Sequence, residues 1–175
     1  MSKRFALTAA GAAAAAVGGS ASAEIISFTI HNDYYIGENS WTISDSASNI
    51  IASMFVSNGS LFVGTSQSST YGVDFGLWDS SATSPLDNGY RTTFQMDLGA
   101  GDYTVRMGDT WGDGWVWNSV NGLDAFAVAG NLAGGNQTFS MVSTSATVDT
   151  FTVVPAPGAL ALLGLAGIAG RRKRG

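Results

Sequence analysis

Between residues 24 and 154, apolar and polar side chains alternate in short runs. A period of two places successive side chains on opposite faces of a strand, and the aromatic and β-branched residues in these runs favour that structure. Turn sequences such as Asn58-Gly59 and Asn121-Gly122 separate the runs. The pattern predicts strands over residues 26–30, 41–43, 49–56, 71–78, 90–98, 103–107, 125–128, 137–142 and 148–153.

Many short strands with few helix-forming segments are typical of an all-β domain, either an antiparallel β-sandwich or a jelly roll. A segment of about 130 residues can bury one core, so residues 24–153 are predicted to form a single ectodomain. Residues 65–69 and 79–88 are predicted loops. The chain has no cysteine, which excludes disulfides and thiolate chemistry.

The N-terminus has the three-part pattern of a secretory signal. Lys3 and Arg4 form a basic start, an Ala-rich apolar stretch follows, and small residues occupy positions 21 and 23. This pattern predicts a signal helix over residues 1–23, with signal peptidase recognising Ala21 and Ala23 and cutting after Ala23. The protein is therefore expected to be exported through the inner membrane.

The C-terminus, residues 154–175, combines a proline motif, an apolar run and a basic cluster. The apolar run spans 13 residues, 158–170, and a helix of that length reaches about 20 Å, short of the roughly 30 Å hydrocarbon core. A basic cluster directly after such a run stays on the cytoplasmic side. We therefore expect a processed sorting tail with transient membrane association, carried by Val154, Pro155, Ala156, Pro157, Gly158, Arg171, Arg172, Lys173 and Arg174.

The order and spacing of these parts resemble the PEP-CTERM sorting signals of Gram-negative bacteria, in the variant with Val-Pro-Ala-Pro-Gly. Ala156 stands where the commonest form has glutamate. The resemblance implies recognition by a membrane transpeptidase of the exosortase type, which would cleave near the proline motif. The ectodomain would then be released or attached at the cell surface, in the outer envelope or in the extracellular matrix.

Charge separates the ectodomain from its signals. All 13 acidic residues lie within 24–154, but only Arg91 and Arg106 of the eight basic residues do, so this part carries a net charge of −11 with histidine neutral. Phosphate binding requires lysine or arginine, which argues against nucleic acid as a partner. The same charge favours solubility and attracts divalent cations.

Two acidic loops are candidate metal ligands. Asp109, Asp113 and Gly114 imitate positions one, five and six of a calcium loop, but Trp111 at position three and Val120 at position twelve exclude an EF-hand. The loop after the first predicted strand supplies Asp33 and Glu38. If both loops lie at one end of the sandwich, these four acids can share calcium; alternatively, they only form turns.

The two loops and their flanking strands, residues 28–43 and 98–114, resemble a β-sandwich module of secreted bacterial proteins. In that module an acidic turn precedes Glu-x-x-Trp, and a later strand leads into an Asp-x-x-Gly-Asp-Gly turn. Trp111 stands where the module usually has tyrosine. The resemblance implies a domain that accompanies catalytic domains or sorting signals and is itself not catalytic.

The tryptophans leave two alternatives. Trp111, Trp115 and Trp117 are candidates for a platform that stacks against sugars such as exopolysaccharide, or they are core residues. His31, the sole histidine, is predicted to lie at the surface. A Ser-His-Asp grouping and a glycosidase-like Asp109/Asp113 pair remain as enzyme alternatives. The sequence favours a non-enzymatic, surface-sorted β-sandwich, with a carbohydrate-binding module as the alternative.

Overall fold

A computed structural model of the chain describes residues 23–115 and 125–155. Ten strands lie in these ranges: β1 (Glu24–Asn32), β2 (Asn39–Ser44), β3 (Ile50–Ser57), β4 (Ser60–Thr65), β5 (Val73–Leu77), β6 (Tyr90–Leu98), β7 (Gly101–Asp109), β8 (Phe126–Ala129), β9 (Gln137–Phe139) and β10 (Ala146–Val153). Within the same ranges, helical turns are limited to α1 (Ser68–Tyr71) and η1 (Pro85–Asp87). Most of the predicted signal and sorting segments, with both predicted terminal helices, lie outside the described residues.

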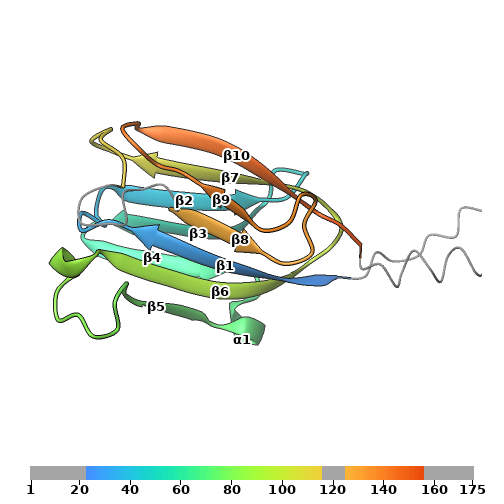
Figure 1. The fold of residues 1–175 in the computed structure, drawn as a ribbon, viewed down its shortest axis with the longest axis horizontal. Coiled ribbons are helices and arrows are strands. Elements are labelled where there is room, and N and C mark those ends of the chain that lie inside the picture. Colours follow the sequence, from blue (N-terminus) through green and yellow to red (C-terminus); the bar gives the residue numbers. More distant parts are fainter. Residues whose placement is uncertain (1–22, 116–124, 156–175) are drawn as a thin grey trace, which may run out of the picture.

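The strands form two five-stranded sheets, which confirms the predicted all-β architecture (Figure 1). One sheet has the order β5-β6-β1-β8-β9, and the other has the order β10-β7-β2-β3-β4. All neighbouring strands are antiparallel. The chain passes from one sheet to the other after β1, β4, β6, β7 and β9.

The core lies between the sheets and follows from the alternation in the sequence. Phe28 of β1 stacks on Phe94 of the neighbouring β6, with ring centroids 4.8 Å apart. Across the interface, Phe28 meets Phe151 of β10 edge-on at 5.9 Å, and Trp41 of β2 stacks on Phe94 at 5.7 Å. Burial of these large rings is the main driving force for joining the two sheets.

Several predicted boundaries change in the structure. The predicted strand over 71–78 begins only at Val73, because Tyr71 closes the short helix α1. The predicted strand over 137–142 ends at Phe139, after which the chain turns toward the segment 113–115. Strand β4 is absent from the prediction; it pairs with β3 through a turn in which Asn58 and Gly59 both have positive φ, as a two-residue hairpin requires.

Strand register separates the two ends of the sandwich. Glu24, where β1 starts, pairs with Leu98, and Val153, where β10 ends, pairs with Gly101. Both therefore lie beside the β6–β7 turn. At the opposite end of β7, Asp109 pairs with Asn39. Among the described residues, no helix has the length and apolar character needed to cross a bilayer.

Candidate metal and ligand site

Two loops meet at the end of the sandwich where β2 begins and β7 ends. The pair Asn39 and Asp109 brings the β1–β2 loop, residues 33–38, against the segment that follows β7. Thr110 then donates its backbone N–H and its hydroxyl to the carbonyl oxygen of Glu38, at 3.0 and 3.2 Å. Both acidic loops therefore lie at the same end of the sandwich. The shared site predicted from the sequence requires this arrangement.

Three of the four candidate metal ligands gather here. Glu38, Asp109 and Asp113 each offer a carboxylate oxygen, and these oxygens all lie within 4.8 Å of one another. The pKa of Glu38 is raised above its ordinary value, first by burial and then by the negative charges of Asp109 and Asp113. Three carboxylates of one sign this close repel one another unless a proton or a cation lies among them.

Asp109 is the most buried member of this acidic group, with 5% of its surface exposed. Its Oδ1 accepts backbone N–H groups from Trp111 at 2.8 Å and from Gly112 at 3.2 Å, which fixes the start of the turn. Its Oδ2 is buried and has no hydrogen-bond partner. An ionised carboxylate normally satisfies both of its oxygens, so this atom is available to a ligand.

Asp33, the fourth candidate, has a different place. Its side chain is buried, and its Oδ1 accepts the backbone N–H of Tyr35 at 2.9 Å, which closes an Asx-turn at the end of β1. It does not belong to the group formed by Glu38, Asp109 and Asp113. Asp33 therefore shapes the loop that presents Glu38.

The segment after β7 is held in place by the chain that leaves β9. Trp115 donates its backbone N–H to the carbonyl oxygen of Met141 at 2.9 Å, and Ser143 donates to the carbonyl oxygen of Asp113 at 3.0 Å. Gly114 lies between them with φ of 81°, and a Cβ there would come within 2.5 Å of the Met141 carbonyl oxygen. Close backbone contact and left-handed geometry both demand glycine at this position.

The candidate tryptophans separate in the structure. Trp111 is 79% exposed, whereas Trp115 is fully buried and donates its ring Nε1–H to the carbonyl oxygen of Gly108 at 3.2 Å. Trp115 is therefore a core residue, which was one of the two alternatives, and its ring cannot stack against a sugar. Trp117 lies outside the described residues.

Trp111 contributes to a pocket of about 320 Å³ whose other lining residues are Tyr35, Glu38 and Asp113. Tyr35 is 44% exposed, so two aromatic rings and two carboxylates face a common space. The volume falls within the range of small-molecule sites. Tyr35 is not among the site residues predicted from the sequence, although its place in the acidic loop near Asp33 is a signal that identifies it as a candidate.

His31 does not lie at the surface, and that prediction is wrong. The side chain is 4% exposed, and its ring stacks on Trp78 with centroids 3.7 Å apart. Its Nε2–H donates a hydrogen bond to the carbonyl oxygen of Asn88 at 2.6 Å. Burial lowers the pKa of His31 despite this bond, so the ring is neutral near pH 7 and holds the β5–β6 connection against β1.

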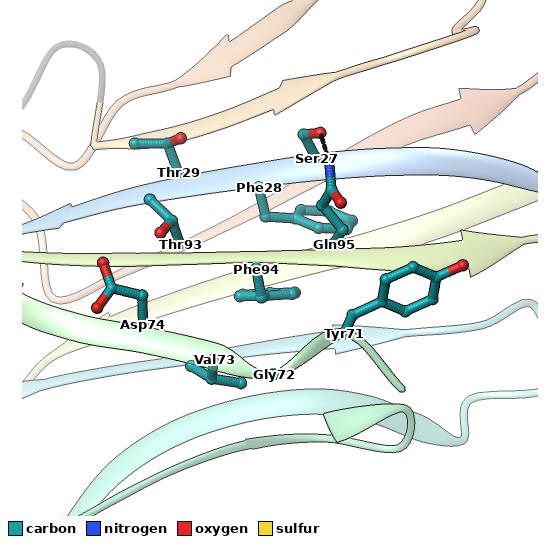
Figure 2. A pocket seen from close by; sticks show the side chains of 10 residues that line it. All are labelled: Ser27, Phe28, Thr29, Tyr71, Gly72, Val73, Asp74, Thr93, Phe94 and Gln95. Atoms are coloured by element: carbon teal, nitrogen blue, oxygen red, sulfur yellow. Dashed lines mark hydrogen bonds between the residues drawn. The ribbon is translucent and has the colours of Figure 1, made fainter. Parts of the chain in front are cut away.

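A second hollow, of about 550 Å³, lies over β1, β5 and β6 (Figure 2). Its polar lining includes Ser27 and Gln95, whose side chains are hydrogen-bonded at 3.1 Å, with the ring of Tyr71 at one side. Asp74 also lines it and forms an ion pair with Arg91 at 3.3 Å. None of the candidate residues from the sequence lines this hollow, because its polar side chains, such as Ser27 and Gln95, occupy the solvent-facing positions of alternating strands.

Comparisons with known proteins add no relative. No family model matches the chain, and neither a curated protein nor a solved structure matches it.

Proposed function

We propose that this chain is an exported protein of the cell surface or extracellular matrix, whose β-sandwich is a non-catalytic domain sorted by an exosortase-type transpeptidase. One observation carries the proposal. Strand β1 begins at Glu24, directly after the expected signal cleavage at Ala23, and β10 ends at Val153, directly before the proline motif at 154–158. The described strands therefore lie between the two expected processing sites, and no strand has to be cut for either signal to be removed.

The positions of the chain ends support a role in display. Glu24 and Val153 lie at one end of the sandwich, and the acidic group lies at the other. The nine residues of β7 between these ends span about 30 Å at roughly 3.4 Å per residue. A protein attached near residues 154–158 would hold its candidate site away from the surface that carries it.

One feature favours a domain without catalysis. His31 is neutral, stacked on Trp78 and hydrogen-bonded to a backbone carbonyl, so its ring holds the fold together instead of activating a nucleophile.

The test of sorting uses the full chain in a host that encodes an exosortase. The cluster Arg171–Arg174 is changed to four glutamines, and a matched control changes it to four lysines, which keeps the charge. The glutamine variant is expected to accumulate as an unprocessed precursor in the membrane fraction, while the lysine control reaches the surface if charge is what the sorting machinery reads. Normal maturation of the glutamine variant would contradict the proposal.

A second candidate function is carbohydrate binding by the pocket of Tyr35, Glu38, Trp111 and Asp113. The observation in its favour is the ring of Trp111, which is 79% exposed beside a second aromatic ring and two carboxylates. Aromatic faces pack against the apolar faces of sugars, and carboxylates accept hydrogen bonds from their hydroxyls. The exopolysaccharide of the producing cell is the natural first ligand to examine.

Binding of that polysaccharide can be compared in the full chain and in two variants. Trp111→Ala is expected to weaken binding at least tenfold, about 1.4 kcal/mol. Tyr71→Ala serves as the matched control, because Tyr71 belongs to the second hollow on the sheet face. A loss in the Tyr71 variant alone would move the binding site to that hollow, and no binding by the unaltered protein would exclude this function.

A further inference from the structure

The buried Oδ2 of Asp109 lacks a partner at a place where two more carboxylates converge. Asp109 is 95% buried, and its other oxygen already accepts two backbone N–H groups. The unpartnered oxygen has lost its water without gaining a hydrogen bond, which is costly for a charged group. Glu38 and Asp113 bring two further carboxylates to the same space, and neither can donate a hydrogen bond to Asp109 while ionised.

No basic side chain in residues 24–154 is placed to neutralise this acidic group. Only Arg91 and Arg106 are available in that span. Arg91 forms its ion pair with Asp74 at 3.3 Å. Arg106 lies on β7 three residues before Asp109. Because side chains alternate along a strand, exposed Arg106 and buried Asp109 point to opposite faces of the sheet. Within the described residues, no side chain supplies the missing positive charge.

We propose that Glu38, Asp109 and Asp113 bind one divalent cation of the calcium class at the floor of the pocket beneath Tyr35 and Trp111. Each residue supplies a carboxylate oxygen, and Asp109 supplies its otherwise unpartnered Oδ2. Hard cations prefer such oxygens, and water entering through the open pocket completes the coordination. The inference goes beyond the proposed function, since it depends neither on sorting nor on a sugar.

The spacing of the oxygens fits a calcium ion. Two oxygens that share a calcium ion at about 2.3–2.6 Å lie no more than about 5 Å apart. Oxygens within 4.8 Å of one another satisfy this limit as they stand. Magnesium demands near-ideal octahedral geometry at about 2.0–2.1 Å and gives up its water reluctantly, so a group of protein carboxylates suits it less.

Backbone hydrogen bonds hold both loops in position without a bound ion. The carbonyl oxygen of Glu38 accepts two hydrogen bonds from Thr110, and the carbonyl oxygen of Asp113 accepts one from Ser143. These bonds fix the backbone on both sides of the acidic group, so little chain entropy has to be lost on binding. A bound cation would join the β1–β2 loop to the segment after β7 through side chains as well as backbone.

The test is a titration of the chelator-treated full chain with calcium. Calorimetry measures binding, and thermal unfolding measures the change in stability. One saturable site per chain is expected, with a higher melting temperature in calcium and at least tenfold weaker binding of magnesium. Terbium supplies a second readout, because the exposed ring of Trp111 beside the site should sensitise terbium luminescence and calcium should displace the ion. Absence of saturable binding at millimolar calcium would overturn the proposal.

Variants locate the site. Asp113→Asn and Glu38→Gln change side chains that are not fully buried, so the fold is expected to persist, and each should weaken calcium binding at least tenfold. Asp149→Asn is the matched control: it removes one negative charge from β10 at a residue paired with Val105, four residues before Asp109 on the neighbouring strand. Equal binding by all three variants would show that calcium binds elsewhere, whatever the result of the sorting test.

Discussion

Trp78 covers one face of the buried His31 ring, and the backbone carbonyl oxygen of Asn88 accepts a hydrogen bond from the ring. Because burial lowers the pKa of His31 below its ordinary value, the folded chain binds fewer protons at this ring than the unfolded chain does. The stability that depends on the neutral ring is fully present above the unfolded pKa, about 6.5, and is lost as the pH falls below it.

We therefore expect the melting temperature of the chelator-treated protein to fall between pH 7.5 and pH 5.5. His31→Gln keeps a donor for Asn88 but does not titrate. That variant should be less stable at pH 7.5 and should lose less stability over the same interval. Thermal unfolding at both pH values measures the two slopes, and equal slopes would show that His31 is not the titrating group.

Glu38 has the opposite effect on the pH dependence of stability from His31. Its pKa is raised, so ionisation of Glu38 opposes folding above that pKa, and the penalty is relieved as the pH falls through it. In chelator-treated protein at pH 7, Glu38→Gln is expected to raise the melting temperature by about 1 °C, which corresponds to a few tenths of a kcal/mol at a partly exposed site. Asp149→Asn, outside the acidic group, is the control and should change it less.

At the scale of elements, the segment after β7 depends on a glycine. Gly114 has φ of 81° and a Cβ there would meet the Met141 carbonyl oxygen at 2.5 Å, whereas Gly134 has φ of 85° with nothing within 4 Å. Both alanine variants carry the cost of left-handed backbone, about 1 kcal/mol or more. Only Gly114→Ala adds a backbone clash.

Chemical denaturation of the two variants separates these costs. Gly114→Ala should lose at least about 1 kcal/mol more free energy of unfolding than Gly134→Ala, because the loop must move away from Met141. The same movement displaces Asp113, so calcium binding should weaken in Gly114→Ala and not in Gly134→Ala. Equal losses of stability would contradict the close packing of this loop.

Most strands could be predicted from the sequence because alternation and Asn-Gly turns are local signals. Strand β4 could not, because its run Leu61-Phe62-Val63 does not alternate; Phe62 points outward and stacks on Phe55 of β3 at 5.2 Å. The outer face of this hairpin is apolar, and a pattern that expects polar residues on that face does not recognise it. The end of β9 was overestimated for a related reason, since Met141 is buried beyond the strand.

The candidate site was partly predictable. Local spacing identified Glu38, Asp109 and Asp113, but their convergence depends on the pairing of Asn39 with Asp109, a contact between distant segments. Asp33 and Trp115 have the same local signals as their neighbours, and only the three-dimensional packing separates them: Asp33 shapes a turn, and Trp115 fills the core. The unpartnered oxygen of Asp109 leaves no trace in the sequence.

At the scale of the whole molecule, the sandwich is acidic and polarised. The span 24–154 has 13 acidic residues and two arginines, so its negative charges repel one another. A bound cation would reduce this repulsion, and a nearby anionic surface would add to it. The chain enters and leaves at one end, and the acidic group lies at the other (Figure 1). This polarity suits a domain that is held by its C-terminal end and presents its loops outward.

We propose that the folded domain reaches the cell surface after both flanking signals have been removed. The most direct test is the intact mass of the protein recovered from the envelope and medium of an exosortase-containing host. We expect a chain that begins at Glu24 and ends near the motif at 154–158, with or without an attached group. A surface protein that still carries residues 1–23 or Arg171–Arg174 would contradict the account.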